Sequence, residues 1–401
     1  MQYYRMDPAL STELAAFGGT TLGRCFSCGN CTAVCGLSKG DTVFPRKIIR
    51  YLQVGLSDRL LESPEPWLCY YCGTCSETCP RDAEPGELMM ATRRWLVSKY
   101  DWTGLSKRLY LSEAWEFGLL AGVALFVLAM FLVPGWLGAA FGFSAINTSA
   151  LEHVRLDLFA PTDVIHYADL ALAGLLGVLL GVNALRMVLF VRKGMRHLKT
   201  PPSIWLGKVY EILVHGATQK RWLQCDNDAR GKWLRHFLLV TGYATMFLLV
   251  IVFLPAFQRE GSDFHYTAIF GYYATVVLLG VTLLAMRSRL KKQEQYHRFS
   301  HASDWMFLVL LFLTALSGIA LHAVRLLDLP WPTYILYVVH LMIAVPMLVI
   351  EVPFGKWNHL VFRPVAQYLV AVREVAQARQ PAPAPPPRHA PSPRHAPAVA
   401  R

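Results

Sequence analysis

Two copies of one cysteine pattern constrain this chain more than any other feature. Eight of its nine cysteines fall in residues 25–35 and 69–79, and each run reads C-x2-C-x2-C-x3-C. Three thiolates on one tight loop, followed by a fourth, are the spacing that holds a cubane iron–sulfur cluster. The sequence therefore predicts two 4Fe–4S clusters near the N-terminus. The ninth cysteine, Cys225, has no partner in this spacing.

The fourth cysteine of each run is expected to serve the other cluster, as it does in two-cluster proteins with this spacing. The first cluster would then be held by Cys25, Cys28, Cys31 and Cys79, and the second by Cys69, Cys72, Cys75 and Cys35. Such crossing joins two distant loops into one small domain and offsets a thin apolar core. The alternative is a pair of zinc sites, but zinc motifs generally pair two CxxC knuckles.

Helical periodicity surrounds the two cysteine runs. Residues 44–55 place Ile48, Ile49 and Leu52 near one face, with Pro45 at an allowed helix start. Residues 85–96 read the same way. The N-terminal region is therefore expected to be an α-helical ferredoxin-type domain, and the whole chain to be all-α.

Six later stretches are long and apolar enough to span a bilayer. They cover residues 115–141, 163–191, 235–257, 265–286, 304–326 and 333–354. With 54% hydrophobic and 16% charged residues, the chain fits a soluble head on a membrane body. We expect three parts: a cytoplasmic two-cluster domain (1–114), a six-helix membrane cytochrome b domain (115–363) and a basic, Pro-rich, disordered tail (364–401).

The excess positive charge lies mostly in loops beside the apolar stretches. The net charge is +12, and the segments 192–235 and 287–298 are rich in Arg and Lys, whereas 142–162 and 258–264 carry one Arg each. The positive-inside rule then places both termini and the cysteine head in the cytoplasm, with the body in the inner (cytoplasmic) membrane. Eight thiols in metal-type spacing also favour a reducing compartment. No nucleic-acid partner is needed to explain the charge.

Histidines within the apolar stretches indicate what the body does, because an imidazole inside a membrane is expensive and usually functional. His236 opens the third stretch at the inner side, and His359 follows the sixth at the same depth. This pair is predicted to hold haem b. His340 lies nineteen residues before His359, and a continuous helix of that length rises about 28 Å. His340 would then serve a second haem near the outer leaflet.

The outer partner of His340 is less determined. His166 begins the second stretch on the outer side and is the favoured ligand, with His322 at the end of the fifth stretch as the alternate. Met246 is a further candidate, as a thioether ligand. Any one of these histidines can instead be bonded to a neighbouring carbonyl or contact a quinone.

The order of these parts resembles a known family. The cysteine head resembles the C subunit of heterodisulfide reductase. The body, through Arg235-His236, His340 and the stretch Pro353-Phe-Gly-Lys-Trp-Asn-His359, resembles the E subunit, which is related to the haem b subunit of respiratory nitrate reductase. A fusion of the two is similar to the C subunit of quinone-interacting membrane-bound oxidoreductase complexes. The resemblance covers most of residues 14–370.

The resemblance implies haem b, menaquinone as an exchangeable substrate, and soluble flavin and iron–sulfur partners resembling the A subunit of heterodisulfide reductase. No G-x-G-x-x-G or phosphate loop is present, so a flavin must lie on another chain. We expect an electron-transfer and quinone-interacting subunit of an oxidoreductase, with substrate catalysis on its partners. Arg325, Lys356 and Arg363 are candidate quinone contacts. The same wiring serving a hydrogenase or another dehydrogenase, and a non-catalytic membrane anchor, are the alternatives.

Overall fold

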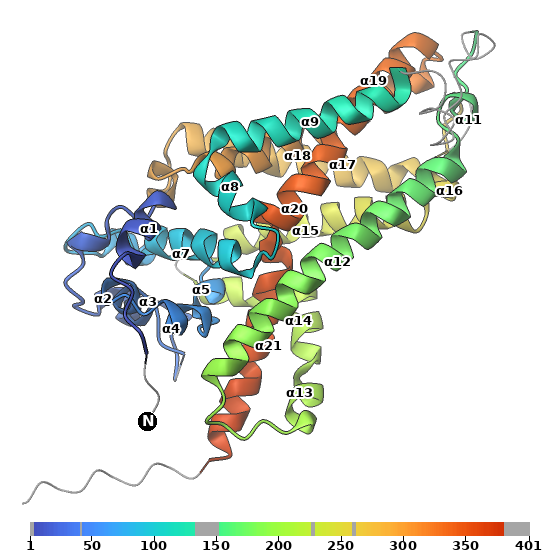
Figure 1. The fold of residues 1–401 in the computed structure, drawn as a ribbon. Helices are drawn as coiled ribbons and strands as arrows, with labels where there is room; N and C mark the ends of the chain where they lie inside the picture. Colours follow the sequence, from blue (N-terminus) through green and yellow to red (C-terminus); the bar gives the residue numbers. More distant parts are fainter. Residues whose placement is uncertain (1–3, 41, 133–151, 226–228, 259–261, 381–401) are drawn as a thin grey trace, which may run out of the picture.

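The computed structural model describes residues 4–40, 42–132, 152–225, 229–258 and 262–380. Within these ranges the regular elements are helices, apart from one isolated β-bridge between Lys39 and Thr42 (Figure 1). The expected all-α fold is confirmed.

The cysteine-bearing head is built from short helices and one long one. They are α1 (Leu10–Ala16), η1 (Leu22–Arg24), α2 (Asn30–Ala33), α3 (Arg46–Gln53), α4 (Ser57–Leu61), α5 (Glu65–Leu68), α6 (Thr74–Glu77), α7 (Pro85–Tyr100) and α8 (Leu105–Leu111). Helix α3 buries Ile48, Ile49 and Leu52, which confirms the predicted helical face. Proline stands at the first position of α7, where its missing N–H removes no helical hydrogen bond.

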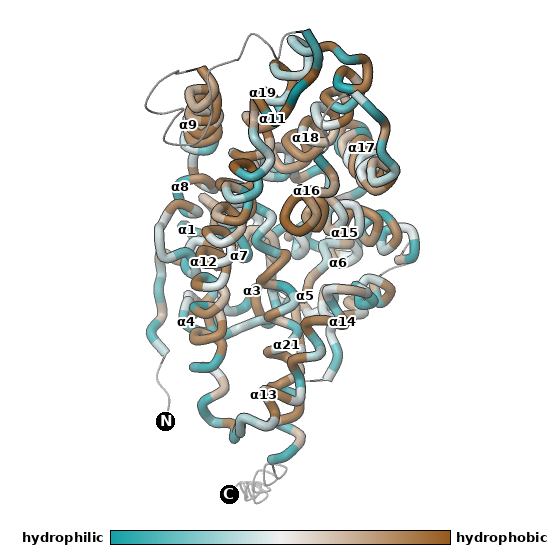
Figure 2. Tube along the Cα trace, turned by 90° about the vertical axis from the view of Figure 1, so that its right-hand side faces the viewer, coloured by the Kyte–Doolittle hydropathy of each residue, from teal (hydrophilic) through white to brown (hydrophobic). Residues whose placement is uncertain are grey.

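Among the described residues, six helices are long and apolar enough to cross a membrane, as predicted. They are α9 (Glu113–Leu132), α12 (Thr162–Gly194), α15 (Ala229–Ile251), α17 (Ala268–Leu290), α18 (Ala302–Leu326) and the stretch that begins with α19 (Pro330–Pro346) and runs to Phe354. These helices are coloured largely hydrophobic in Figure 2, and Val178 and Val276 are among their exposed apolar side chains. Residues 133–141 of the first predicted stretch lie outside the described residues.

Short helices connect these spans. They are α11 (Leu156–Phe159), α13 (Pro202–Lys208), α14 (Tyr210–Thr218), η3 (Lys220–Gln224), α16 (Leu254–Phe257) and η4 (Gln295–Arg298). Helices α13 and α14 pack against the last helix of the chain, α21 (His359–Ala378) (Figure 1). Trp222 of η3 packs against Tyr70 of the head, so the connection between α12 and α15 is part of the contact between head and body.

The sixth span is not a straight helix. Helix α19 ends at Pro346, a π-helical turn η5 (Met347–Glu351) leads into α20 (Val352–Phe354), and η6 (Lys356–Asn358) follows an extended Gly355. Proline removes a backbone donor and crowds the preceding turn, and π-helical turns of this kind are frequent at functional sites. We expected a continuous helix between His340 and His359. That expectation is wrong, because the helix is interrupted between these two residues.

Helix α21 corrects the predicted boundary of the tail at residue 364. The chain stays helical to Ala378 and buries a regular apolar face that includes Phe362, Leu369 and Val372. In the sequence analysis, the prolines after residue 380 led us to place these residues in the tail despite their apolar periodicity. Residues 381–401, which carry most of the Pro-rich segment, lie outside the described residues.

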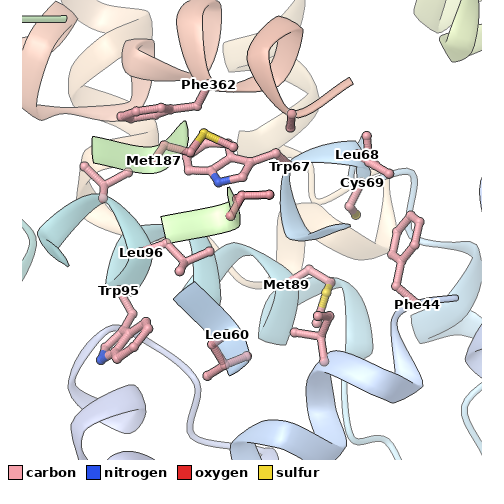
Figure 3. Close-up of a cluster of buried hydrophobic side chains, with 14 of the residues drawn as sticks. Phe44, Leu60, Trp67, Leu68, Cys69, Met89, Trp95, Leu96, Met187 and Phe362 are labelled. Carbon is pink, nitrogen blue, oxygen red and sulfur yellow. The ribbon is translucent and has the colours of Figure 1, made fainter. Parts of the chain in front are cut away.

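The core of the head is shared with the membrane body. Trp67 of α5 packs against Phe362 of α21, with ring centroids 4.8 Å apart, and Met187 from the end of α12 lies in the same cluster (Figure 3). Arg186 of α12 also donates to the backbone oxygen of Tyr100 at 2.7 Å. A small domain buries little apolar surface on its own. Here α12 and α21 complete the core and fix the head against the spans.

Candidate cofactor sites

The two cysteine loops adopt the same backbone conformation. Ser27 and Tyr71, at matching places in the two runs, have φ of 63° and 58°, and the following Gly29 and Gly73 have φ of 94° and 93°. Glycine accepts this left-handed region without strain, whereas a side chain there is uncommon and marks a constrained loop. Each glycine starts a short helix, α2 or α6. The repeat in the sequence is therefore a repeat in structure.

Backbone N–H groups point at thiols in both loops. The bonds run from Ser27 to Cys25 Sγ (3.4 Å), from Tyr71 to Cys69 Sγ (3.3 Å) and from Ala83 to Cys79 Sγ (3.4 Å). Donors aimed at sulfur stabilise thiolates and tune the reduction potential of iron–sulfur clusters. The loops thus present the hydrogen bonds that such a group requires.

The thiols gather into two groups that cross between the runs. The Cys31 thiol interacts electrostatically with those of Cys25, Cys28 and Cys79, and the Cys35 thiol with those of Cys69 and Cys72. Burial raises the pKa of Cys31 and of Cys35 to about 11. Thiols held this way ionise only beside cationic charge, which bound iron supplies. In the described ranges, no group of three or more His, Cys, Asp or Glu side chains is arranged closely enough to hold a lone metal ion.

Cys225 corrects our expectation that the ninth cysteine has no partner. Its side chain is buried, hydrogen-bonds with Cys72, and interacts with Cys69 and Cys35. Cys225 follows η3, far from both runs in sequence. Spacing carries no signal for it, since only the docking of the head brings the residues together.

His236 and His359 face each other, with ring centroids 6.5 Å apart. The Nδ1 atom of His236 is bonded to Oε1 of Gln219, and that of His359 to the backbone oxygen of Lys356 at 2.7 Å. Such acceptors fix the tautomer of a metal-bound histidine and leave Nε2 for the metal. Metal–imidazole bonds are about 2 Å long, so an iron ion fits between the two rings. The predicted pair is thus brought together, with the ring centroids far enough apart to admit a metal ion.

An aromatic side chain connects the second cysteine loop to His236. Trp222 of η3 packs against Tyr70, with ring centroids 4.6 Å apart, and against His236 at 5.3 Å. Tyr70 directly follows Cys69 in the chain. Arg363 of α21 lies 4.4 Å from the centre of the Tyr70 ring and donates to the backbone oxygen of Cys69 at 3.2 Å. Sequence spacing gives no signal for this contact.

His340 lines a cavity of about 370 Å³ among the spans. Its Nδ1 is bonded to Ser317 Oγ at 2.9 Å, and Gly318 lies beside its ring. His322 and Tyr272 line the same cavity and are bonded to each other at 2.9 Å. The structure therefore brings the alternate ligand, His322, to the space that His340 faces.

His166 lies elsewhere at the start of α12. Its neighbour Ile165 lines the cavity, but His166 is not among the described residues that do so. Its Nδ1 is buried and has no hydrogen-bond partner among the described residues. Met246, the thioether candidate, does line the cavity. Placement thus favours His322 over His166 as the neighbour of His340.

The three candidate quinone contacts have different surroundings. Arg363 binds the head, through the backbone oxygens of Trp67 and Cys69. Lys356 forms an ion pair with Asp304 of α18. Arg325 lines the cavity of His340. Only Arg325, of these three, therefore borders a space large enough for part of a ligand.

Comparison with known proteins supports the prediction of an iron–sulfur domain at the N-terminus. A family model described as a 4Fe-4S dicluster domain matches residues 21–83. The chain is 40% identical over 96 residues to a protein of Archaeoglobus profundus described as similar to the C subunit of heterodisulfide reductase, which is 24% of this chain and 51% of that protein. It is 37% identical over 75 residues to the iron–sulfur C subunit of the CoB–CoM heterodisulfide reductase of Methanopyrus kandleri, which is 19% of this chain and 39% of that protein.

A third relative is the C subunit of the H(2):CoB-CoM heterodisulfide,ferredoxin reductase of Methanothermobacter thermautotrophicus, 35% identical over 88 residues, which is 22% of this chain and 48% of that protein. The chain thus spans about half or less of the length of these relatives. No solved structure matches it. The head is an iron–sulfur domain similar to the C subunit of heterodisulfide reductase, joined here to six apolar helices.

Proposed function

We propose that this chain is the membrane electron-transfer subunit of a respiratory oxidoreductase complex. It holds two 4Fe–4S clusters in the head and haem b between His236 and His359, and it connects a cytoplasmic flavin and iron–sulfur partner with menaquinone. The observation that carries the proposal is the unbroken series of side-chain contacts from the second cysteine loop through Trp222 to the facing histidines.

The residues of the chain supply placement and tuning. When bound, the clusters and haem supply one-electron chemistry, which is what joins a two-electron flavin to a two-electron quinone. Cys25, Cys28, Cys31 and Cys79 would hold one cluster, and Cys69, Cys72, Cys75 and Cys35 the other. Gln219 and the Lys356 carbonyl orient the two imidazoles. Trp222 lies between Tyr70 and His236 and packs against both rings.

The cavity beside His340 is the second site. Ser317 fixes the tautomer of His340, and His322 lies on the adjacent helix in the same cavity. This placement supports a second haem held by His340 and His322, with His166 retained only as the ligand suggested by sequence. If the chain holds one haem, the same cavity suits a quinone head group, because Arg325 and the Tyr272–His322 pair offer polar contacts in an apolar space.

Membrane orientation and partners follow from charge and from the relatives. The Arg- and Lys-rich connections support an inner-membrane protein with its head and both termini in the cytoplasm. The relatives are named as subunits of heterodisulfide reductases, which supports soluble redox partners for this head. Substrate chemistry belongs to those partners. A hydrogenase or another dehydrogenase served by the same wiring is the second candidate.

A haem and iron count on the detergent-purified protein, with co-purifying partners identified by mass spectrometry, tests the proposal. Two haems b and about ten irons per chain are expected, since each 4Fe–4S cluster brings four. One haem and about nine irons would assign the cavity of His340 to quinone. A chain without haem would refute the proposed path and leave the body as an anchor.

Substitution of a haem ligand sharpens the test. His359→Ala should remove the inner haem while both clusters keep their paramagnetic signals, because the described contacts of the His359 ring are with His236 and the Lys356 carbonyl. His153→Ala is the control, since His153 is exposed and pairs with Asp328, away from these rings. Unchanged haem content in His359→Ala would overturn the assignment of the pair.

A further inference from the structure

The second cysteine group contains a fifth thiol, from a distant part of the chain. Cys69, Cys72 and Cys35 all interact with Cys225, which the membrane body contributes. Cys225 is only 6% exposed, and its direct hydrogen-bond partner is the Cys72 thiol. The thiols at this site therefore outnumber the four ligands that a cubane cluster needs.

The backbone around Cys225 is fitted to the same loop. A Cβ atom at Gly36 would clash with the carbonyl oxygen of Gln224, so only glycine allows this approach. Gly36 directly follows Cys35, a ligand expected for the second cluster. A hydrogen bond thus holds Cys225 against Cys72, and a close backbone contact holds Gln224 against Gly36, the residue after Cys35.

The connection that carries Cys225 also touches the haem site. Gln219 bonds His236, and Trp222 packs between His236 and Tyr70. Residues 219–225 therefore contact the second cysteine group and the facing histidines together. A change in the cluster's electrostatics made by this segment acts at the point where the head meets the body.

We propose that Cys225 is a tuning thiol of the second cluster, which donates an S–H···S hydrogen bond to the Cys72 thiolate and raises the reduction potential of that cluster. The inference rests on the proposed function, because it requires a cluster in the second group. Reduction adds negative charge to the cluster and its thiolates. A buried donor stabilises that charge, so its hydrogen bond favours the reduced state.

Cys225 is assigned as a donor and not as a ligand for a geometric reason. Cys35, Cys69, Cys72 and Cys75 interact with one another and complete a set of four. Cys225 comes from a distant part of the chain, directly after η3, and hydrogen-bonds with Cys72 of that set. Its burial also limits competition from water for this hydrogen bond.

The test is a redox titration followed by electron paramagnetic resonance on the full chain with its partners, comparing wild type, Cys225→Ala and Cys225→Ser. In the alanine variant, the second cluster should become about tenfold harder to reduce, a lowering of about 59 mV for one electron. The serine variant keeps an O–H donor and should retain a potential near that of wild type. The first cluster is the internal control, with an unchanged potential expected.

A second measurement does not depend on the size of that shift. In D2O, the reduced second cluster of wild type should show a strongly coupled exchangeable deuteron, which Cys225→Ala should lose. Identical potentials and deuteron couplings in wild type and Cys225→Ala would overturn the inference. Loss of four irons in Cys225→Ala, with the first cluster intact, would also overturn it, because Cys225 would then be a ligand. A wild-type protein without a second cluster would instead refute the proposed function.

Discussion

Phe362 of α21 packs into the core of the head, so replacing it should weaken the contact between α21 and α5. It is 1% exposed and packs against Trp67 at 4.8 Å and Tyr100 at 5.4 Å, ring centroid to ring centroid. A buried Phe→Ala change costs about 3–5 kcal/mol from lost burial and the cavity left behind. That is a large part of the roughly 5–15 kcal/mol that stabilises a whole domain.

The expected effect is local opening of the contact between α5 and α21. At about 1.4 kcal/mol for each tenfold change, the loss in Phe362→Ala increases opening by about a hundredfold to a few thousandfold. Hydrogen–deuterium exchange of peptides from these two helices, followed by mass spectrometry, measures that change. His359 lies one turn before Phe362 on the same helix face, so haem content should fall as well.

Two comparisons isolate the cause. Phe362→Leu keeps an apolar side chain in the core and should exchange more slowly than the alanine variant. Phe247→Ala removes a ring that is 47% exposed on α15 and should leave exchange in α5 and α21 unchanged. If Phe362→Ala exchanges like wild type in both helices, the reasoning that this core fastens head to body is refuted.

Three further predictions test other parts of the structure. Cys79→Ser should damage the cluster built mainly from the first cysteine run, as read by electron paramagnetic resonance; damage confined to the second cluster would contradict the crossed ligation. Trp222→Leu should slow haem reduction by the reduced head several-fold in stopped-flow measurements, with unchanged haem content. Trp222→Phe keeps an aromatic ring and should retain most of the rate. Equal rates in the leucine and phenylalanine variants would show that the ring is not part of the electron path. Glu65 forms buried ion pairs with Lys47 (3.0 Å) and Arg373 (3.1 Å), so Glu65→Gln should destabilise the docked head by about 3–5 kcal/mol in thermal unfolding, with the exposed Glu77→Gln as control. Burial alone would raise the pKa of Glu65, but Arg373 and Lys47 outweigh burial and lower that pKa from 4.5. The ionised Glu65 carboxylate therefore stabilises the fold fully above pH 4.5, and this stabilisation is lost as the pH falls through the folded pKa. A pH profile of stability that is the same for wild type and Glu65→Gln would contradict this.

Helical periodicity and apolar length were enough to predict the large elements. The buried face of α3 and the six spans follow from residues within one helix, whose side-chain directions repeat every 3.6 residues. The prolines at 346 and 353 are visible in the sequence too, but the π-helical turn at Met347–Glu351, which packs against α18, was not predicted from it. The boundary at residue 364 was wrong because the Pro-rich segment after α21 was given more weight than the apolar periodicity of that helix.

The sequence by itself determined which residues can carry the chemistry: eight thiols in a spacing that few metal groups accept, and histidines within apolar stretches. Only the tertiary structure decided which residues lie next to these thiols and histidines. It set Cys225 against Cys72, Trp222 between Tyr70 and His236, and His322 rather than His166 in the cavity of His340. The physical reason is range. Spacing in the chain records contacts within one loop or helix, whereas these contacts join residues of different elements, which meet only when the helices pack.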